Sequence, residues 1–150
     1  MTVPLDLVLP KVWVFFYGSY MNFDVLKEVD VVPGEWEVAR APGFDIRIAP
    51  RANLVRSDQH TVWGINATAT HVELSRLYAD HAKALLGETY LPEAILTYSA
   101  DGKPRAAMTY LCPAMESRPA DLAYVERVAG PARQHRFPDW YIERIERHRP

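Results

Sequence analysis

The hydrophobic pattern of the chain consists of short apolar runs between polar turns, and it predicts about six strands. Residues 11–17 form a continuous apolar run rich in β-branched and aromatic side chains, which is typical of a strand covered on both faces. The same signals predict further strands at residues 35–41, 44–49, 60–69, 90–98 and 105–112. Residues 50–59 are polar enough to be predicted as a loop.

Glycine residues mark the expected ends of several elements. Pro42-Gly43 predicts a turn between two neighbouring strands, and Asp101-Gly102 predicts a tight hairpin between the last two. The last two helices of the chain are expected at residues 120–129, ending at Gly130, and at residues 140–147. The C-terminal part of the chain is therefore expected to be helical.

Capping signals predict two further helices. Asn22 is a suitable N-cap for a short helix over residues 23–29. Thr70 and Glu73 have the spacing of a capping box, in which each side chain satisfies a free backbone N–H group of the helix start. Gly87 is a natural end for the helix that follows, because glycine accepts the left-handed conformation found there.

The order of these elements predicts the fold class. Strands occur mostly in a run, with helices between and after them, which indicates an α+β protein. We expect a curved mixed sheet or a small β-barrel of about six strands flanked by helices. Residues 1–150 contain no repeat or linker, so a single domain is expected.

Composition and charge narrow the classes of function. The 150 residues carry 17 basic and 19 acidic side chains, a formal net charge of −2, so no nucleic-acid partner is expected. The apolar runs are far shorter than a membrane span and the first ten residues lack an export signal, so no membrane partner is expected. The single cysteine, Cys112, favours a reducing compartment, which predicts a cytoplasmic protein.

The segment Tyr17-Gly18-Ser19-Tyr20-Met21 is the most informative local feature. It follows a predicted strand and precedes a predicted helix, so glycine allows a sharp turn and the next N–H groups are free at a helix start. Such a turn is suited to bind an anion. A tight strand-to-helix connection that binds no ligand shows the same sequence pattern, and this alternative stays open.

Four short motifs occur in an order that is typical of one family. They are Val14-Phe-Phe-Tyr-Gly-Ser-Tyr-Met21, Val62-Trp-Gly-Ile65, the hairpin that ends in Thr109-Tyr110, and Tyr124-Val-Glu-Arg-Val-Ala-Gly130 followed by Phe137-Pro138 and Tyr141-Ile142. Taken together, the chain resembles the γ-glutamylcyclotransferase-like family. The resemblance covers residues from about Val12 to Ile145.

The resemblance implies an activity and a site. Members of this family cyclise a γ-glutamyl amine or short γ-glutamyl peptide to 5-oxoproline and release the free amine, without a metal or organic cofactor. A small γ-glutamyl substrate would therefore be the partner, and the protein would be a monomer or homodimer. By resemblance, the substrate-binding residues are Tyr17, Gly18, Ser19, Tyr20, Met21, Tyr90 and Tyr124.

At the expected position of the general base, the sequence departs from the pattern of the family. The family has a glutamate just after the acidic helix, and direct alignment places His81 there, with Asp80 beside it. If the helix is one turn longer, Glu88 is the nearest carboxylate. A partly buried carboxylate can have its pKa raised towards neutrality, and a histidine accepts a proton near pH 7 without any shift. Glu88, His81 and Asp80 are the candidate catalytic residues.

Two other interpretations stay open. In the first, the chain is a non-catalytic relative that binds a small carboxylate or amide in the same pocket. This interpretation is based on the replacement of the expected glutamate in the region of His81. His81 is also compatible with an ordinary core histidine, and Glu88 with a solvated loop residue. The five histidines show no paired metal-ligand spacing, and the chain lacks phosphate-loop and dinucleotide motifs, so no metal and no cofactor are expected.

Overall fold

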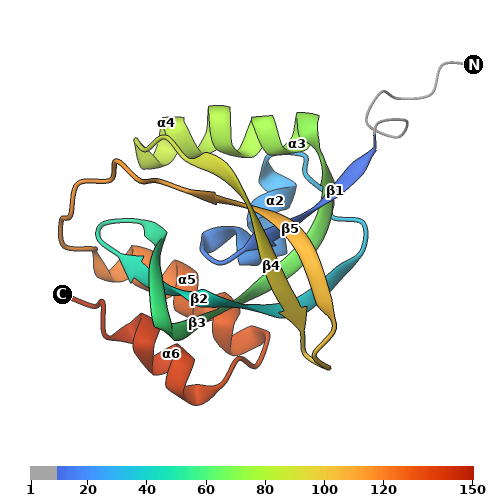
Figure 1. Ribbon diagram of the computed structural model, residues 1–150. Coiled ribbons are helices and arrows are strands. Elements are labelled where there is room, and N and C mark those ends of the chain that lie inside the picture. Colours follow the sequence, from blue (N-terminus) through green and yellow to red (C-terminus); the bar gives the residue numbers. More distant parts are fainter. Residues whose placement is uncertain (1–9) are drawn as a thin grey trace, which may run out of the picture.

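Five strands close into a barrel in the computed structural model, which describes residues 10–150 apart from the side chains of residues 85 and 86 (Figure 1). The strands are β1 (Lys11–Phe16), β2 (Trp36–Ile48), β3 (Ala52–Thr70), β4 (Leu91–Ser99) and β5 (Pro104–Leu111). Their order around the barrel is β1-β3-β2-β4-β5, with antiparallel neighbours except where β5 meets β1 in parallel. The expected α+β class with a curved mixed sheet is confirmed.

The expected strands at residues 35–41 and 44–49 are one strand, β2, so the described residues contain five strands rather than six. The turn predicted at Pro42-Gly43 is wrong. Gly43 has a φ of 91°, and the register with β3 shifts between Pro42 and Phe44 before pairing resumes. Proline and glycine therefore mark a bulge, because the partner strand continues past them and keeps the backbone paired.

The loop predicted at residues 50–59 is also wrong, because residues from Ala52 onward belong to β3. The second half of β2 pairs with this segment, from Phe44 opposite Arg56 to Ile48 opposite Ala52. Arg56 and Asp58 have exposed side chains. These side chains are polar because they are exposed to solvent, while their backbone belongs to the hairpin of β2 and β3.

Helices cover two sides of the barrel (Figure 1). They are the 3₁₀ helix η1 (Ser19–Met21), α2 (Phe23–Glu28), α3 (His71–Ser75), the π-helical η2 (Arg76–His81), α4 (Ala82–Leu86), α5 (Leu122–Gln134) and α6 (Asp139–Glu146). The segment from α3 to α4 lies along one side, and α5 and α6 lie on another. Within residues 10–150, no helix is long and apolar enough to cross a membrane.

The predicted caps are present. The Asn22 side chain accepts a hydrogen bond from the N–H group of Asp24 at the start of α2. Thr70 and Glu73 form the capping box at the start of α3. Gly87 ends α4 in the left-handed conformation, with a φ of 72°. These local signals are confirmed because each depends on residues a few positions apart.

The helix end predicted at Gly130 is wrong, because α5 continues to Gln134. Its buried face includes Val125, Val128 and Ala132, and each of these side chains is fully buried. This apolar stripe continues past Gly130 at helical spacing. Burial of the last turn therefore outweighs the weak helix propensity of glycine.

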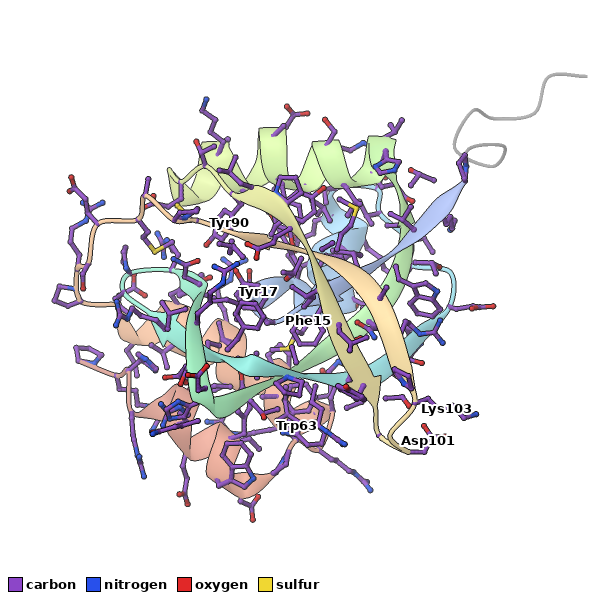
Figure 2. The ribbon with its side chains drawn as sticks, in the orientation of Figure 1. Phe15, Tyr17, Trp63, Tyr90, Asp101 and Lys103 are labelled. Atoms are coloured by element: carbon purple, nitrogen blue, oxygen red, sulfur yellow. The ribbon has the colours of Figure 1, made fainter. Side chains whose placement is uncertain are left out.

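The barrel interior is filled by large side chains, and Gly64 makes room for them. Phe15 is fully buried inside the barrel (Figure 2). A Cβ atom at Gly64 would lie 2.4 Å from the carbonyl oxygen of Phe16 and 2.6 Å from Cζ of Phe15. On the outer side, Trp63 packs against Phe137 of the segment between α5 and α6, with ring centroids 6.0 Å apart. The core thus extends from the barrel to the C-terminal helices.

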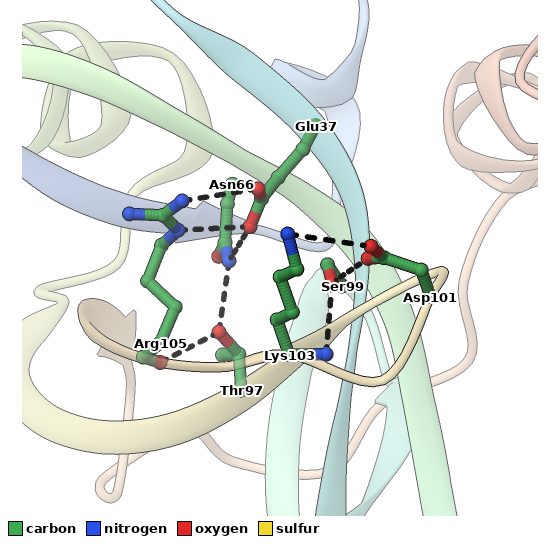
Figure 3. A network of polar contacts seen from close by, with 7 residues as sticks. All are labelled: Glu37, Asn66, Thr97, Ser99, Asp101, Lys103 and Arg105. Atoms are coloured by element: carbon green, nitrogen blue, oxygen red, sulfur yellow. Dashed lines mark hydrogen bonds and ion pairs between the residues drawn. The ribbon is translucent and has the colours of Figure 1, made fainter.

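A polar network ties four strands together away from the helix-covered ends (Figure 3). Asn66 is fully buried, and its Nδ2 donates to Oγ1 of Thr97 at 2.8 Å and to Oε2 of Glu37 at 3.1 Å. Nε of Arg105 donates to the same Glu37 oxygen at 3.0 Å. The buried Oδ1 of Asn66 has no partner among the described residues, so the network links β2, β3, β4 and β5 through Nδ2 of Asn66 and through Arg105.

Substitution of the two glycines tests this description of the core and of α5. We expect Gly64→Ala to lower the free energy of unfolding by about 3 kcal/mol, because the added methyl group overlaps the Phe16 backbone. Gly130→Ala is the matched control. Its methyl group meets no atom within 4 Å, and alanine favours a helix interior, so we expect a gain of about 0.5–1 kcal/mol. Urea unfolding of both variants provides the measurement, and a stable Gly64→Ala or a destabilised Gly130→Ala contradicts the description.

Candidate functional site

A cavity lined mainly by aromatic side chains lies where β1 ends, and we call it the aromatic cavity. It encloses about 330 Å³, including its open mouth. Its lining residues are Phe16, Tyr17, Gly18, Ser19, Tyr20, Ala52, Tyr78, Ala82, Tyr90, Tyr110 and Tyr124. Six of the seven residues expected to bind substrate are therefore brought together. Met21 is fully buried and does not line this cavity.

The turn after β1 presents backbone donors to the aromatic cavity. Gly18 caps η1, and the N–H group of Met21 donates to the Gly18 carbonyl at 3.1 Å. The N–H groups of Ser19 and Tyr20 hold the first positions of η1, where the helix itself provides no acceptor. A Cβ atom at Gly18 would lie 3.0 Å from Cβ of Ala52, so this turn packs closely against the start of β3.

Tyrosine hydroxyl groups fix the cavity wall at Ala52. Oη of Tyr90 donates to the Ala52 carbonyl at 2.7 Å, and Oη of Tyr124 accepts from the Ala52 N–H group at 3.1 Å. The hydroxyl proton of Tyr17 is also used, because it donates to the Tyr110 carbonyl at 2.6 Å. Tyr124 accepts at this contact and also has a side-chain contact with Ser19, so the fold holds its hydroxyl group at two points.

Burial keeps these hydroxyl groups protonated. It raises the pKa of Tyr17 and of Tyr90 well above the ordinary tyrosine value, and neighbouring tyrosines raise both further. The pKa of Tyr124 is also raised by burial, and its contacts with Ala52, Arg51 and Ser19 oppose part of that increase. The cavity therefore presents neutral hydrogen-bonding groups at every ordinary pH.

Tyr78 and Tyr110 complete the cavity, and the sequence prediction did not include them among the binding residues. Their rings are stacked, with centroids 3.9 Å apart and an interplanar angle of 8°. Tyr78 also meets the Tyr20 ring edge to face at 5.4 Å. They come from η2 and β5, so only the closed barrel brings them to the turn after β1. Their sequence signal is a tyrosine on a helix face or strand, which is common in any core.

A second, more polar hollow adjoins the aromatic cavity, and we call it the outer hollow. It encloses about 700 Å³, including its open mouth. Its lining residues are Ser19, Tyr20, Arg51, His81, Asp121, Ala123, Tyr124 and Arg127. Ser19, Tyr20 and Tyr124 also line the aromatic cavity, so the two spaces share a wall.

His81 lies in the outer hollow with a defined partner. Its Nδ1 is 2.8 Å from Oη of Tyr20, and that hydroxyl donates to the Leu77 carbonyl at 3.1 Å. A tyrosine hydroxyl has one proton, so when Tyr20 donates it to Leu77, Nδ1 of His81 donates to Tyr20. In that tautomer Nε2 holds a free lone pair. Burial lowers the pKa of His81 below 6.5, and the positive charge of Arg127 lowers it further, so the imidazole is neutral at pH 7.

The two carboxylate candidates for the base lie elsewhere. Oε2 of Glu88 accepts a weak hydrogen bond from Sγ of Cys112 at 3.8 Å, and Oε1 is 4.0 Å from a guanidinium nitrogen of Arg118. Asp80 is exposed. Neither residue lines the aromatic cavity or the outer hollow. Across residues 10–150, no cluster of three or more histidine, cysteine or acidic side chains is arranged to hold a metal ion.

Asp121 is the acidic residue that lines the outer hollow, and it already has a role in the fold. Its side chain accepts a hydrogen bond from the N–H group of Tyr124 at 2.7 Å and so caps α5. This cap orients the first turn of α5, from which Tyr124 reaches Ala52. Sequence reasoning missed Arg51 and Asp121 because neither belongs to a recognisable motif, and it missed Arg127 because the motif of residues 124–130 gave that residue no role.

Comparisons with known proteins place this fold. No family model matches the sequence, and no curated protein matches it. The structure is similar to a solved γ-glutamyl cyclotransferase, with a TM-score of 0.75 at 19% identity, over 91% of this chain and 87% of that chain. An uncharacterized human protein gives a TM-score of 0.75 at 20% identity, over 91% of this chain and 86% of that one.

A yeast γ-glutamyl cyclotransferase specific to glutathione is a more distant match. Its TM-score is 0.63 at 10% identity, and the alignment covers 93% of this chain and 97% of the yeast chain. Similarity at such low sequence identity shows a shared fold. It does not show which side chains carry out a reaction. The barrel, its helices and the turn after β1 therefore have the γ-glutamylcyclotransferase-like fold.

Proposed function

We propose that this chain is a γ-glutamylcyclotransferase-type enzyme, which converts a γ-glutamyl amine or short γ-glutamyl peptide to 5-oxoproline and a free amine. The observation that carries the proposal is the turn after β1, where the N–H groups of Ser19 and Tyr20 have no acceptor within η1 and both residues line the outer hollow together with a neutral His81. The fold shared with γ-glutamyl cyclotransferases supports it. Fold alone does not determine function, so the residues of the site must supply the chemistry.

In this proposal, the aromatic cavity holds the glutamyl part of the substrate. In its mouth, the tyrosine walls would pack against a folded glutamyl chain, which brings the α-amino nitrogen close to the γ-carbonyl carbon. The N–H groups of Ser19 and Tyr20 stabilise the negative charge that develops on the carbonyl oxygen. The hydroxyl group of Tyr124 lies beside this turn, 4.0 Å from the position of a Cβ atom at Gly18, and adds a further hydrogen-bonding group.

His81 acts as the base in the proposed mechanism. The α-ammonium group first releases one proton to solvent, and the free amine attacks the γ-carbonyl carbon to form the ring C–N bond and an oxyanion. Nε2 of His81 takes a second proton from the attacking nitrogen and gives it to the nitrogen of the leaving amine. Collapse of the oxyanion then breaks the original C–N bond and releases 5-oxoproline.

Glu88 and Asp80 are the alternative bases. Glu88 is the stronger of the two, because its carboxylate is mostly buried and lies near enough to Tyr90 to raise the pKa of that hydroxyl. It contacts Cys112 and Arg118, and it lines neither of the two hollows. Asp80 is exposed on η2 and would need a large rearrangement to reach the substrate.

A non-catalytic role in ligand binding is the second candidate, and one observation favours it. Among the residues that the structure describes, no carboxylate lines the aromatic cavity. A cavity with aromatic walls and backbone donors is sufficient to bind a small carboxylate or amide without transforming it. The enzyme and the binding protein differ in one respect: only the enzyme needs a group near the turn after β1 that accepts a proton from the substrate.

The role of His81 is tested by substitution of the candidate bases. Purified protein is incubated with γ-glutamyl-alanine, glutathione and γ-glutamyl-lysine, and 5-oxoproline is measured. We expect His81→Gln to lower kcat at least roughly 100-fold for the substrate that is turned over, because general base catalysis is worth about that much. Glu88→Gln is the matched control, and we expect it to stay within about twofold of the parent protein.

Each other outcome has a defined meaning. Loss of activity in Glu88→Gln with activity retained in His81→Gln would assign the base to Glu88. Absence of 5-oxoproline from every substrate, with circular dichroism showing folded protein, contradicts the enzyme. If calorimetry then detects binding of γ-glutamyl-alanine, the non-catalytic role is supported.

The pH dependence gives an independent test of His81. A histidine base works only when neutral, so kcat/KM falls as the pH drops through a pKa that lies below 6.5. Burial and the charge of Arg127 both lower that pKa. We therefore expect Arg127→Gln to move the acid limb to higher pH for the same substrate. If the acid limb does not move, the group that ionises is not influenced by Arg127. That result contradicts His81 as the base.

A further inference from the structure

The outer hollow lies where the leaving part of a γ-glutamyl substrate must be. This inference rests on the proposed function, in which the glutamyl part occupies the aromatic cavity. His81, which delivers a proton to the leaving amine, lines the outer hollow and does not line the aromatic cavity. Since Ser19, Tyr20 and Tyr124 form a common wall, the scissile amide lies between the two spaces.

The outer hollow carries an excess of positive charge. Arg51 and Arg127 contribute two positive charges, Asp121 contributes one negative charge, and His81 is neutral, which leaves a net charge of +1. Asp121 is engaged with the N–H group of Tyr124 at 2.7 Å. Neither arginine forms an ion pair with any carboxylate that the structure describes.

Arg51 is held in place without a hydrogen-bonding partner. Its guanidinium carbon lies 4.7 Å from the centroid of the Tyr124 ring, so it stacks on a residue that lines both hollows. Its Nε is buried, and no acceptor for it is found among the described residues. A buried guanidinium N–H without an acceptor is costly, and no carboxylate of the described residues pairs with this arginine, so the rest of its guanidinium group is available to pair with a ligand carboxylate. By contrast, Arg144 and Arg105 pair with carboxylates of their own fold.

The first turn of α5 strengthens the preference for a negative group. α5 has 13 residues, and Ala123 and Tyr124 of its first turn line the outer hollow. The positive end of a helix dipole favours an anion at this position. This contribution adds to the two guanidinium groups, which supply the directional donors.

We propose that Arg51 and Arg127 form a subsite that binds a carboxylate on the leaving amine, so that γ-glutamyl derivatives of amino acids and peptides are preferred over γ-glutamyl amines. A carboxylate accepts two parallel hydrogen bonds from a guanidinium group, which suits the α-carboxylate of a leaving amino acid. A cationic leaving amine meets two like charges in the same place. The subsite thus determines substrate specificity, and the chemical step depends on His81.

A pair of matched substrates tests the subsite. γ-Glutamyl-alanine and γ-glutamyl-alaninamide have nearly the same shape, and only the first has a carboxylate on its leaving amine. In Arg51→Gln and in Arg127→Gln, we expect the ratio of kcat/KM for the acid over the amide to fall roughly 10-fold, the usual cost of losing one charge-assisted hydrogen bond. The ratio removes effects common to both substrates, such as a changed His81 pKa or lost packing on Tyr124.

Arg147→Gln is the control for a general loss of positive charge. Arg147 is exposed at the end of α6 and lies beside Glu143 and Glu146, outside both hollows. We expect its ratio to equal that of the parent protein. We expect Arg127→Lys, which keeps the charge, to retain more of the ratio than Arg127→Gln does.

Two results overturn the subsite, and they are distinct from failure of the proposed function. An unchanged ratio in both arginine variants contradicts it, and so does an equal fall in Arg147→Gln. If no substrate yields 5-oxoproline, the proposed function fails, and the same ratio is then measured as dissociation constants by calorimetry. A ratio of dissociation constants that favours the acid in the parent protein, and falls in the arginine variants, supports the subsite without turnover, whereas equal affinities overturn it.

Discussion

The two hydrogen bonds at the Ala52 backbone hold the site together. Tyr90 donates to the Ala52 carbonyl and Tyr124 accepts from its N–H group, so residues from the start of β4 and from α5 are fixed to the first residue of β3. The same residue packs against Gly18, because a Cβ there would be 3.0 Å from Cβ of Ala52. The turn after β1, both cavity walls and the hairpin of β2 and β3 are therefore positioned by one residue. Since the carbonyl and N–H are both buried, loss of either hydroxyl group leaves an unpaired polar group.

Sequence reasoning succeeded where the controlling interactions are local and failed where they are not. The capping box of Thr70 and Glu73 and the helix end at Gly87 depend on a few neighbouring residues, so their patterns predict the structure. Gly130 has the same local signal, yet the buried face of α5 continues through it. The polar residues at 50–59 suggest a loop in the sequence, because the sequence does not show that this part of β3 pairs with β2. Long-range pairing and burial thus decide against local propensity.

The candidate site divides in the same way. Most of the turn after β1 could be predicted, because Gly18, Ser19 and Tyr20 are consecutive and follow a recognisable strand. Arg51 and Arg127 could not, because the hairpin and α5 meet only in the folded chain and the motif that contains Arg127 gave that residue no role. The choice of base also depended on geometry. The sequence offered a histidine and two carboxylates within one segment, and the fold places His81 beside the turn while Glu88 faces Cys112.

The absence of charge from the described walls of the aromatic cavity is suited to the proposed reaction. Among the described lining residues, none is acidic or basic, so a substrate ammonium group that enters is desolvated without a compensating negative charge. Desolvation favours the free amine, which is the form that attacks the carbonyl. A carboxylate in that wall would stabilise the ammonium form and oppose this step. In the proposed mechanism, the neutral imidazole of His81 accepts the proton without that cost, and the charges proposed to recognise the leaving group stay in the outer hollow, where water screens them from the amine.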